Sequence, residues 1–125
     1  MKRVVVDAGV LLAWFDAESP HRALRAEYEA GTLAVVGPPE LVAEAMGDLA
    51  RRTGWREERL AIVGSELGRL GIQLQAPQLQ DLAHWLAKGL TPSSAACAAL
   101  AARLEVPLVT DDPDLRRAAS DLLQR

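Results

Sequence analysis

Acidic residues occur at three places where they could support chemistry on a metal ion. Asp7 ends the β-branched run RVVV, and Asp111 with Asp112 ends the apolar run VPLVT. Glu44 lies among apolar neighbours in ELVAEAMGDL. Carboxylates without a nearby His or Cys are the ligands that Mg²⁺ and Mn²⁺ prefer, and a bound cation relieves their mutual repulsion. Such an ion can orient water and stabilise a phosphoryl oxygen during phosphodiester hydrolysis.

Each acid also has an ordinary structural interpretation. An Asp at a strand end is most often a turn former, and Asp112, directly before Pro113, is suited to cap a helix. Asp114 is expected to complement the dipole of that helix in its first turn. Glu44, within a helix, is usually a solvent-exposed residue. Only their joint occurrence at strand ends, or in the helix after a strand, favours a shared site.

Other catalytic chemistries have little support in the sequence. The chain contains no G-x-S-x-G motif, and neither His21 nor His84 has a visible catalytic neighbour. The single cysteine, Cys97, lies in AACAAL and is interpreted as a small buried hydrophobe. One cysteine excludes an internal disulfide framework and a cysteine-rich zinc site. Any metal is therefore expected to be a hard cation held by carboxylates.

Strands and helices alternate along the chain, and this order predicts how the acids are positioned. We expect strands at residues 3–6 and in TLAVVG, IQLQ and VPLVT, with helices between them. The alternation predicts an α/β fold, a three-layer α/β/α sandwich with a parallel central sheet of four to five strands. Ligands of open parallel sheets gather beyond the carboxyl ends of the strands, where Asp7 and Asp112 fall.

Capping residues mark where the helices should begin. Ser19 before Pro20 predicts a helix start that runs to Gly31, and Thr91 and Asp112 predict two more. The last helix is expected to continue from Asp112 to the end of the sequence.

Length and composition fit one domain over residues 1–125. The chain is 50% hydrophobic, which suits a single core, and its net charge of −3 argues against general binding of nucleic acid through basicity. No apolar stretch reaches the roughly 18 residues of a membrane span, and the start lacks a signal-peptide cleavage pattern. We therefore expect a cytoplasmic protein with no membrane association.

Basic and aromatic residues offer candidate contacts to RNA. Arg51, Arg52 and Arg116 could form a rim that attracts phosphates, although cations at helix ends are the more common explanation. Three Trp residues could stack on bases, but packing in the core or at an interface is the more common role of such residues. They are Trp14, Trp55 and Trp85. Trp55, which follows Gly54, is expected to be the most exposed of the three.

Three segments, in this order, resemble the PIN-domain family. They are VVVDAGVLLAWF, PPELVAEAMGDLARR and LEVPLVTDDPDLRRAA. The resemblance is to small bacterial and archaeal members, the toxins of VapBC-type toxin–antitoxin pairs, and it covers almost the whole chain. Each motif is short and degenerate, whereas the set at this total length is fairly specific. The resemblance implies a PIN-like fold and a metal-dependent ribonuclease site.

The resemblance also implies which residues form that site. The acids of the family fall on Asp7, Glu44 and Asp112, which would hold Mg²⁺ or Mn²⁺. The T-x-D pattern at residues 110–112 selects Asp112 over Asp111, and leaves Thr110 and Asp111 in supporting roles. The helix before the last strand usually begins with a further acid. This chain has Ser94 there, which brings no negative charge but could hold a metal-bound water.

Two functions follow from the resemblance. The first is a Mg²⁺- or Mn²⁺-dependent endoribonuclease, the toxin of a pair, which binds an antitoxin-like protein and forms a homodimer through residues 55–70. The second is a catalytically weakened PIN-like module that binds RNA or protein, because losing one carboxylate at Ser94 weakens the binding of a hard dication. A phospho-acceptor receiver domain is rejected, because Asp7 stands alone where that site needs paired acids.

Overall fold

The central sheet has four parallel strands in the computed structural model, which describes residues 1–14, 19–54 and 56–123. Their spatial order is β3-β2-β1-β4. The strands are β1 (Lys2–Val6), β2 (Leu33–Gly37), β3 (Gln73–Leu74) and β4 (Leu108–Val109). The parallel α/β sheet predicted from the sequence is confirmed, although its two outer strands are shorter than IQLQ and VPLVT.

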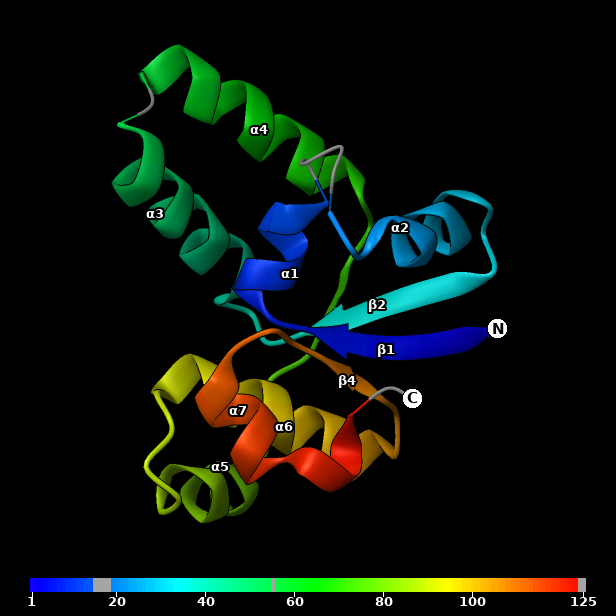
Figure 1. Ribbon diagram of the computed structural model, residues 1–125, viewed down its shortest axis with the longest axis vertical. Helices are drawn as coiled ribbons and strands as arrows, with labels where there is room; N and C mark the ends of the chain where they lie inside the picture. Colours follow the sequence, from blue (N-terminus) through cyan, green and yellow to red (C-terminus); the bar gives the residue numbers. More distant parts are fainter. Residues whose placement is uncertain (15–18, 55, 124–125) are drawn as a thin grey trace.

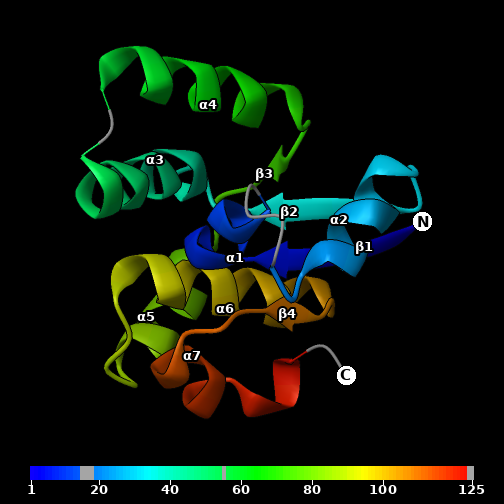
Figure 2. The ribbon, with the colours of Figure 1, turned by 45° about the horizontal axis from the view of Figure 1, so that its top comes forward.

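Helices cover both faces of the sheet and complete the predicted three layers. Figure 1 shows the first four helices on one side of the strands and the later ones on the other, and Figure 2 shows the same separation. The first group is α1 (Ala8–Ala13), α2 (Arg22–Glu29), α3 (Leu41–Thr53) and α4 (Glu57–Arg69). The second group is α5 (Leu79–Leu86), α6 (Pro92–Leu104), α7 (Pro113–Ala118) and the 3₁₀ turn η1 (Ser120–Leu122).

The sheet divides the core into two clusters because side chains alternate along each strand. Val4 and Val6 pack into the cluster under α1 to α4, whereas Val5 packs into the cluster with α5 to α7. In β2, Val35 and Val36 divide in the same way. Because both faces of β1 and β2 are buried, these strands are nearly continuous apolar runs, as parallel strands require.

Helix α6 lies close against the sheet. Every residue from Ala95 to Ala101 is buried, and the helix contacts both β1 and β4. Small side chains on most of its surface allow the helix backbone to come near the strands. This close packing fixes the start of α6, with Ser94 in its first turn, at the carboxyl edge of the sheet.

The structure confirms two of the predicted caps and corrects a third. Thr91 Oγ1 accepts a hydrogen bond from Ser94 N, and Asp112 Oδ1 accepts from two backbone N–H groups of α7. The predicted start at Ser19 is wrong, because α2 begins at Arg22. Ser19 Oγ instead accepts a hydrogen bond from His21 N at 3.1 Å, which forms a turn ahead of the helix.

The prediction of one long helix after Asp112 is also wrong. Helix α7 ends at Ala118, and the chain continues as η1. The reason is that Leu123 forms a parallel bridge with Leu108, so the backbone must leave the helix to run beside β4.

The default prediction for the tryptophans is confirmed where it can be checked. Trp14 and Trp85 are buried, whereas Trp55 lies outside the described residues. Among the helices described, none combines the length and the apolar character needed to cross a membrane.

Candidate active site

The predicted acids meet where the chain changes direction across the sheet. From β1 the chain passes to β2 on one side, and β4 later joins the other side of β1. Val6 of β1 pairs with Val109 of β4, so Asp7 and Thr110 follow their strands side by side. Such a switch point is where open α/β sheets form their ligand sites.

A cavity of about 520 Å³ lies at this switch point. Asp7, Glu44 and Asp112 all line it, although they come from three different elements. Figure 1 shows the starts of α1, α3, α6 and α7 gathered beyond the arrowhead of β1. The other lining residues are Ala8, Gly9, Ala13, Asp48, Ser93, Ser94, Asp111 and Pro113. We refer to this cavity as the acid cavity.

Asp7 is the most buried of the acids. Its side chain is 9% exposed, and Oδ1 accepts a hydrogen bond from Val10 N at 3.0 Å, which caps α1. Oδ2 accepts a hydrogen bond from Thr110 Oγ1. Asp7 therefore follows β1 directly, caps α1 and lines the acid cavity.

Thr110 joins the two acids that follow β1 and β4. Its side chain is buried, and Oγ1 accepts a hydrogen bond from Asp112 N at 3.1 Å while donating to Asp7. Arg116 Nη1 donates to the backbone oxygen of Thr110 at 2.8 Å, which fixes the turn from outside. These hydrogen bonds fix the position of Asp112, after the end of β4, relative to Asp7.

Asp112 has two separable roles. Its Oδ1 caps α7 by accepting from Asp114 N at 2.9 Å and Leu115 N at 3.3 Å, and its carboxylate lines the acid cavity. Asn caps a helix about as well as Asp, but it carries no charge.

We predict that Asp112→Asn and Asp112→Ala affect stability differently. Asp112→Ala should lower the free energy of unfolding by about 1 kcal/mol, because the cap is lost, whereas Asp112→Asn should leave it nearly unchanged. Both should lose RNA cleavage if the charge of this acid is what the site needs. Urea unfolding and a cleavage assay on the same preparations measure the two effects. Equal destabilisation by both variants would contradict the cap role.

Negative charge is poorly compensated inside the acid cavity. Burial raises the pKa of Asp7, the hydrogen bonds from Thr110 and Val10 lower it, and the charges of Asp112 and Asp111 raise it further. Burial also raises the pKa of the Cys97 thiol, which lies behind the site with Sγ 3.9 Å from the backbone oxygen of Val6. The negative charges of Asp7 and Glu44 add to that shift. A cation at the acid cavity would relieve both effects.

The donor chemistry of the acid cavity fits a hard dication, but the donors do not form a close group. Carboxylate and hydroxyl oxygens surround the space, as Mg²⁺ and Mn²⁺ require. Over residues 1–14, 19–54 and 56–123, however, no three His, Cys, Asp or Glu side chains are placed so that they could hold one ion. Side-chain rotation toward the ion is therefore needed before Asp7, Glu44 and Asp112 could share it.

The predicted arginines lie in different surroundings. Arg51 forms an ion pair with Asp48, which lines the acid cavity one turn after Glu44, and its side chain is 71% exposed. Arg116 is bonded to Thr110, as described above. The side chain of Arg52 lies outside the described residues.

One contact of the site was missed by sequence reasoning. His21 Nε2 lies 2.7 Å from Asp111 Oδ2, across 90 positions of the chain. His21 had no visible partner in the sequence, and Asp111 was expected to support the site or face solvent. A pair so distant in sequence leaves no local signal. Only the placement of residues 19–21 against the end of β4 shows it.

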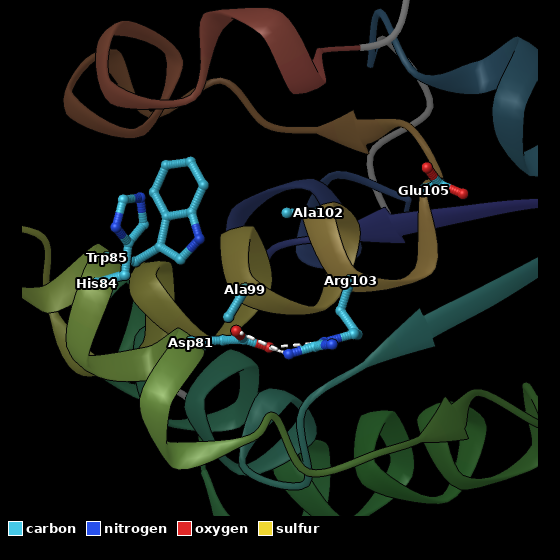
Figure 3. Close-up of a pocket in the computed structure, with 7 residues that line it drawn as sticks. All are labelled: Asp81, His84, Trp85, Ala99, Ala102, Arg103 and Glu105. Carbon is cyan, nitrogen blue, oxygen red and sulfur yellow. Dashed lines mark hydrogen bonds and ion pairs between the residues drawn. The ribbon is translucent and has the colours of Figure 1, made fainter.

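A second cavity, of about 540 Å³, lies between α5 and α6. Figure 3 shows Arg103 of α6 meeting Asp81 of α5, with His84 and Trp85 to one side. Arg103 makes two hydrogen bonds to Asp81, at 2.9 and 3.0 Å. Trp85 meets the ring of His84 edge-on and has Lys88 Nζ 5.4 Å from its ring centroid. These groups hold the two helices together, which leaves the acid cavity as the better candidate for chemistry.

The family of the chain follows from its comparison with known proteins. A model of the PIN domain matches residues 4–121, which include every acid of the cavity. The chain belongs to the PIN-domain family. PIN domains are generally metal-dependent nucleases and typically bind RNA.

The PIN fold of the chain is also found in a solved structure. The crystal structure of PAE2754 from Pyrobaculum aerophilum superposes with a TM-score of 0.69, over 98% of this chain and 90% of that one. The two sequences are 22% identical, so this likeness concerns the fold alone. A search of curated protein sequences found no match.

The acid cavity of this PIN domain departs from the resemblance at one position. Ser94 lines the cavity from the first turn of α6, where the family usually has an acid. Its backbone N–H is bonded to Thr91 Oγ1, so the helix start is intact and only the side chain differs.

Proposed function

We propose that this PIN domain is an endoribonuclease that uses Mg²⁺ or Mn²⁺ held by Asp7, Glu44 and Asp112. The observation that carries the proposal is the meeting of these three acids, from the end of β1, from α3 and from the start of α7, on one cavity at the switch point of the sheet. A bound dication there would activate water and stabilise the charge that develops on the phosphoryl oxygens.

Other residues of the chain hold the proposed metal ligands in position. Val10 and Thr110 bond to Asp7, and Asp112 is bonded to the start of α7, so the backbone positions of these two acids are fixed before any ligand arrives and only side-chain rotation remains. Such preorganisation lowers the cost of assembling the site. Ser94 and Asp111 line the same space in supporting positions.

Three arginines are proposed to contact the phosphates of a bound RNA. They are Arg51, Arg52 and Arg116. The exposed pair of Arg51 with Asp48 is worth little in solution, so Arg51 can exchange that carboxylate for a phosphate. Arg116 donates one N–H to Thr110, and its guanidinium has further donors for a ligand.

The proposed activity is tested by incubating purified protein with single-stranded and structured RNA. Cleavage should require Mg²⁺ or Mn²⁺, stop when EDTA is added and return when excess metal follows. Asp121→Asn, an exposed acid outside the acid cavity, serves as a control and should cleave like wild type. Cleavage that is indifferent to EDTA would contradict a metal-dependent site.

A second candidate function rests on Ser94. Because this residue supplies no charge and the remaining acids stand apart, the domain would bind RNA or protein while cleaving poorly. Binding of RNA without cleavage at millimolar Mn²⁺ would favour this weakened module over the nuclease.

We also propose that the chain is the toxin of a toxin–antitoxin pair and forms a homodimer. Helix α4, within the residues 55–70 predicted for the dimer contact, exposes 60% of Ile62. An antitoxin-like protein would then inhibit cleavage by covering the acid cavity. Light scattering measures the mass of the purified protein, and a monomer at micromolar concentration would contradict the homodimer.

A further inference from the structure

His21 and Asp111 form a contact that joins two distant parts of the chain at the acid cavity. His21 Nε2 donates to Asp111 Oδ2 at 2.7 Å. The His21 side chain is 16% exposed and that of Asp111 is 63% exposed. The backbone N–H of His21 is bonded to Ser19 Oγ, and Ser19 is itself buried. The imidazole therefore projects from an anchored turn.

Asp111 is the residue through which His21 reaches the acid cavity. Asp111 lines the cavity beside Asp112, and its charge contributes to the raised pKa of Asp7. Its electrostatic field thus acts on the acid at the centre of the site. An exposed carboxylate samples several rotamers, and a hydrogen bond at 2.7 Å restricts that freedom.

The acid cavity has lost one negative charge and holds another that the resemblance does not require. Ser94 stands where the family usually has an acid, whereas Asp111 occupies the x position of the T-x-D pattern. Both residues line the same cavity, from the start of α6 and from the end of β4. A carboxylate at Asp111 can therefore act on the same ligand as one at Ser94 would.

We propose that His21 is a positioning residue of the proposed nuclease site, which holds Asp111 at the acid cavity so that Asp111 supplies the negative charge missing at Ser94. The inference rests on the proposed metal-dependent function. The donor role of Nε2 is served by the neutral tautomer with the proton on Nε2 and by the imidazolium. If the pair were only a surface ion pair, it would contribute little to stability, and replacing His21 would leave Mn²⁺ affinity unchanged.

The test measures Mn²⁺ binding by calorimetry, which is independent of RNA cleavage. His21→Leu and Asp111→Asn should each weaken Mn²⁺ binding about tenfold, the lower end of what partners behind metal ligands contribute. The double variant should be no weaker than Asp111→Asn alone, because His21 acts through the charge of Asp111 and has nothing left to position once that charge is gone. His21→Gln, whose amide can donate to Asp111, should keep most of the affinity. His84→Leu, at the other histidine, should bind like wild type.

One further variant tests the compensation directly. In the Asp111→Asn background, Ser94→Asp should restore Mn²⁺ affinity to within about threefold of wild type, because it returns one carboxylate to the same cavity. Circular dichroism of each variant verifies that the fold is retained.

Two outcomes would overturn the inference. One is normal Mn²⁺ affinity in His21→Leu, and the other is additive loss in the double variant. If wild type still binds Mn²⁺ and cleaves RNA in those cases, only the role of His21 fails. If wild type neither binds Mn²⁺ nor cleaves RNA, the proposed function fails and the inference fails with it.

Discussion

Asp7→Asn should abolish RNA cleavage and at the same time make the metal-free protein more stable. Cleavage should fall at least about a hundredfold, because even partners outside the ligand set of a metal site contribute 10- to 100-fold. Stability should rise because Asn removes a charge that is costly to bury. Asn keeps the oxygen that accepts from Val10, and its amide can donate to Thr110 Oγ1, which reverses the direction of the bond that Asp7 accepts from this hydroxyl.

The gain in stability should depend on pH, with a definite sign. Burial raises the pKa of Asp7 above its ordinary value of 3.8. Below that value the carboxyl is protonated in both folded and unfolded chains, so ionisation costs nothing. As pH rises through the raised pKa, the folded protein must carry a buried charge and the wild type loses stability. The difference between Asp7→Asn and wild type should therefore be small near pH 4 and largest near pH 8.

Thermal unfolding in EDTA measures this difference. Each kcal/mol removed from the cost of the buried charge should raise Tm by about 3–6 °C in a domain of this size. Added Mn²⁺ should raise the Tm of wild type but not of Asp7→Asn, because a ligand stabilises only the protein that binds it. A lower Tm for Asp7→Asn at pH 8 would contradict the electrostatic description of Asp7. Full cleavage by this variant would contradict the proposed site.

Ser94→Asp should convert the site into one that binds metal about tenfold more tightly and cleaves RNA faster. The substitution returns a carboxylate to the wall of the acid cavity. Position 94 is three residues after the cap Thr91, in the first turn of α6, where an acid also interacts well with the helix dipole. The helix should therefore tolerate the change.

The expected gain from Ser94→Asp is specific to that position. Ser93→Asp adds the same charge one residue earlier, also beside the acid cavity, and is the matched control. Calorimetry with Mn²⁺ and cleavage rates should both improve in Ser94→Asp more than in Ser93→Asp. If wild type already cleaves as fast as Ser94→Asp, the lost acid is dispensable and the weakened module is contradicted. If only Ser94→Asp cleaves, the weakened module describes the natural protein.

Much of the fold could be predicted because its strands have strong local patterns. Val4, Val5 and Val6 are continuously apolar since both faces of β1 are buried, and their alternation between two clusters follows from strand geometry alone. The caps at Thr91 and Asp112 could be predicted from the sequence, because a capping side chain bonds to a backbone N–H only two or three residues later. The placement of Asp7 beside Thr110 also follows from strand order, once β1 and β4 are neighbours.

The remaining features depend on contacts that no local pattern contains. Helix α7 stops at Ala118 because Leu123 returns to Leu108, fifteen residues away. Ser19 has the chemistry of a cap, but the structure uses it for a turn that presents His21. That turn matters only because Asp111 lies beside it in space. Tertiary contacts thus determine both where α7 ends and which residue, His21, bonds to Asp111.

The position of β4 in the sheet also sets when the acid cavity can come into existence during synthesis. Asp7 is synthesised 103 positions before its partner Thr110, and the capping acid Asp112 also follows β4. Until β4 pairs with β1, the Asp7 carboxylate lacks the hydroxyl that orients it, and one edge of β1 is uncovered. During translation the acid cavity therefore stays incomplete until β4 has left the exit tunnel.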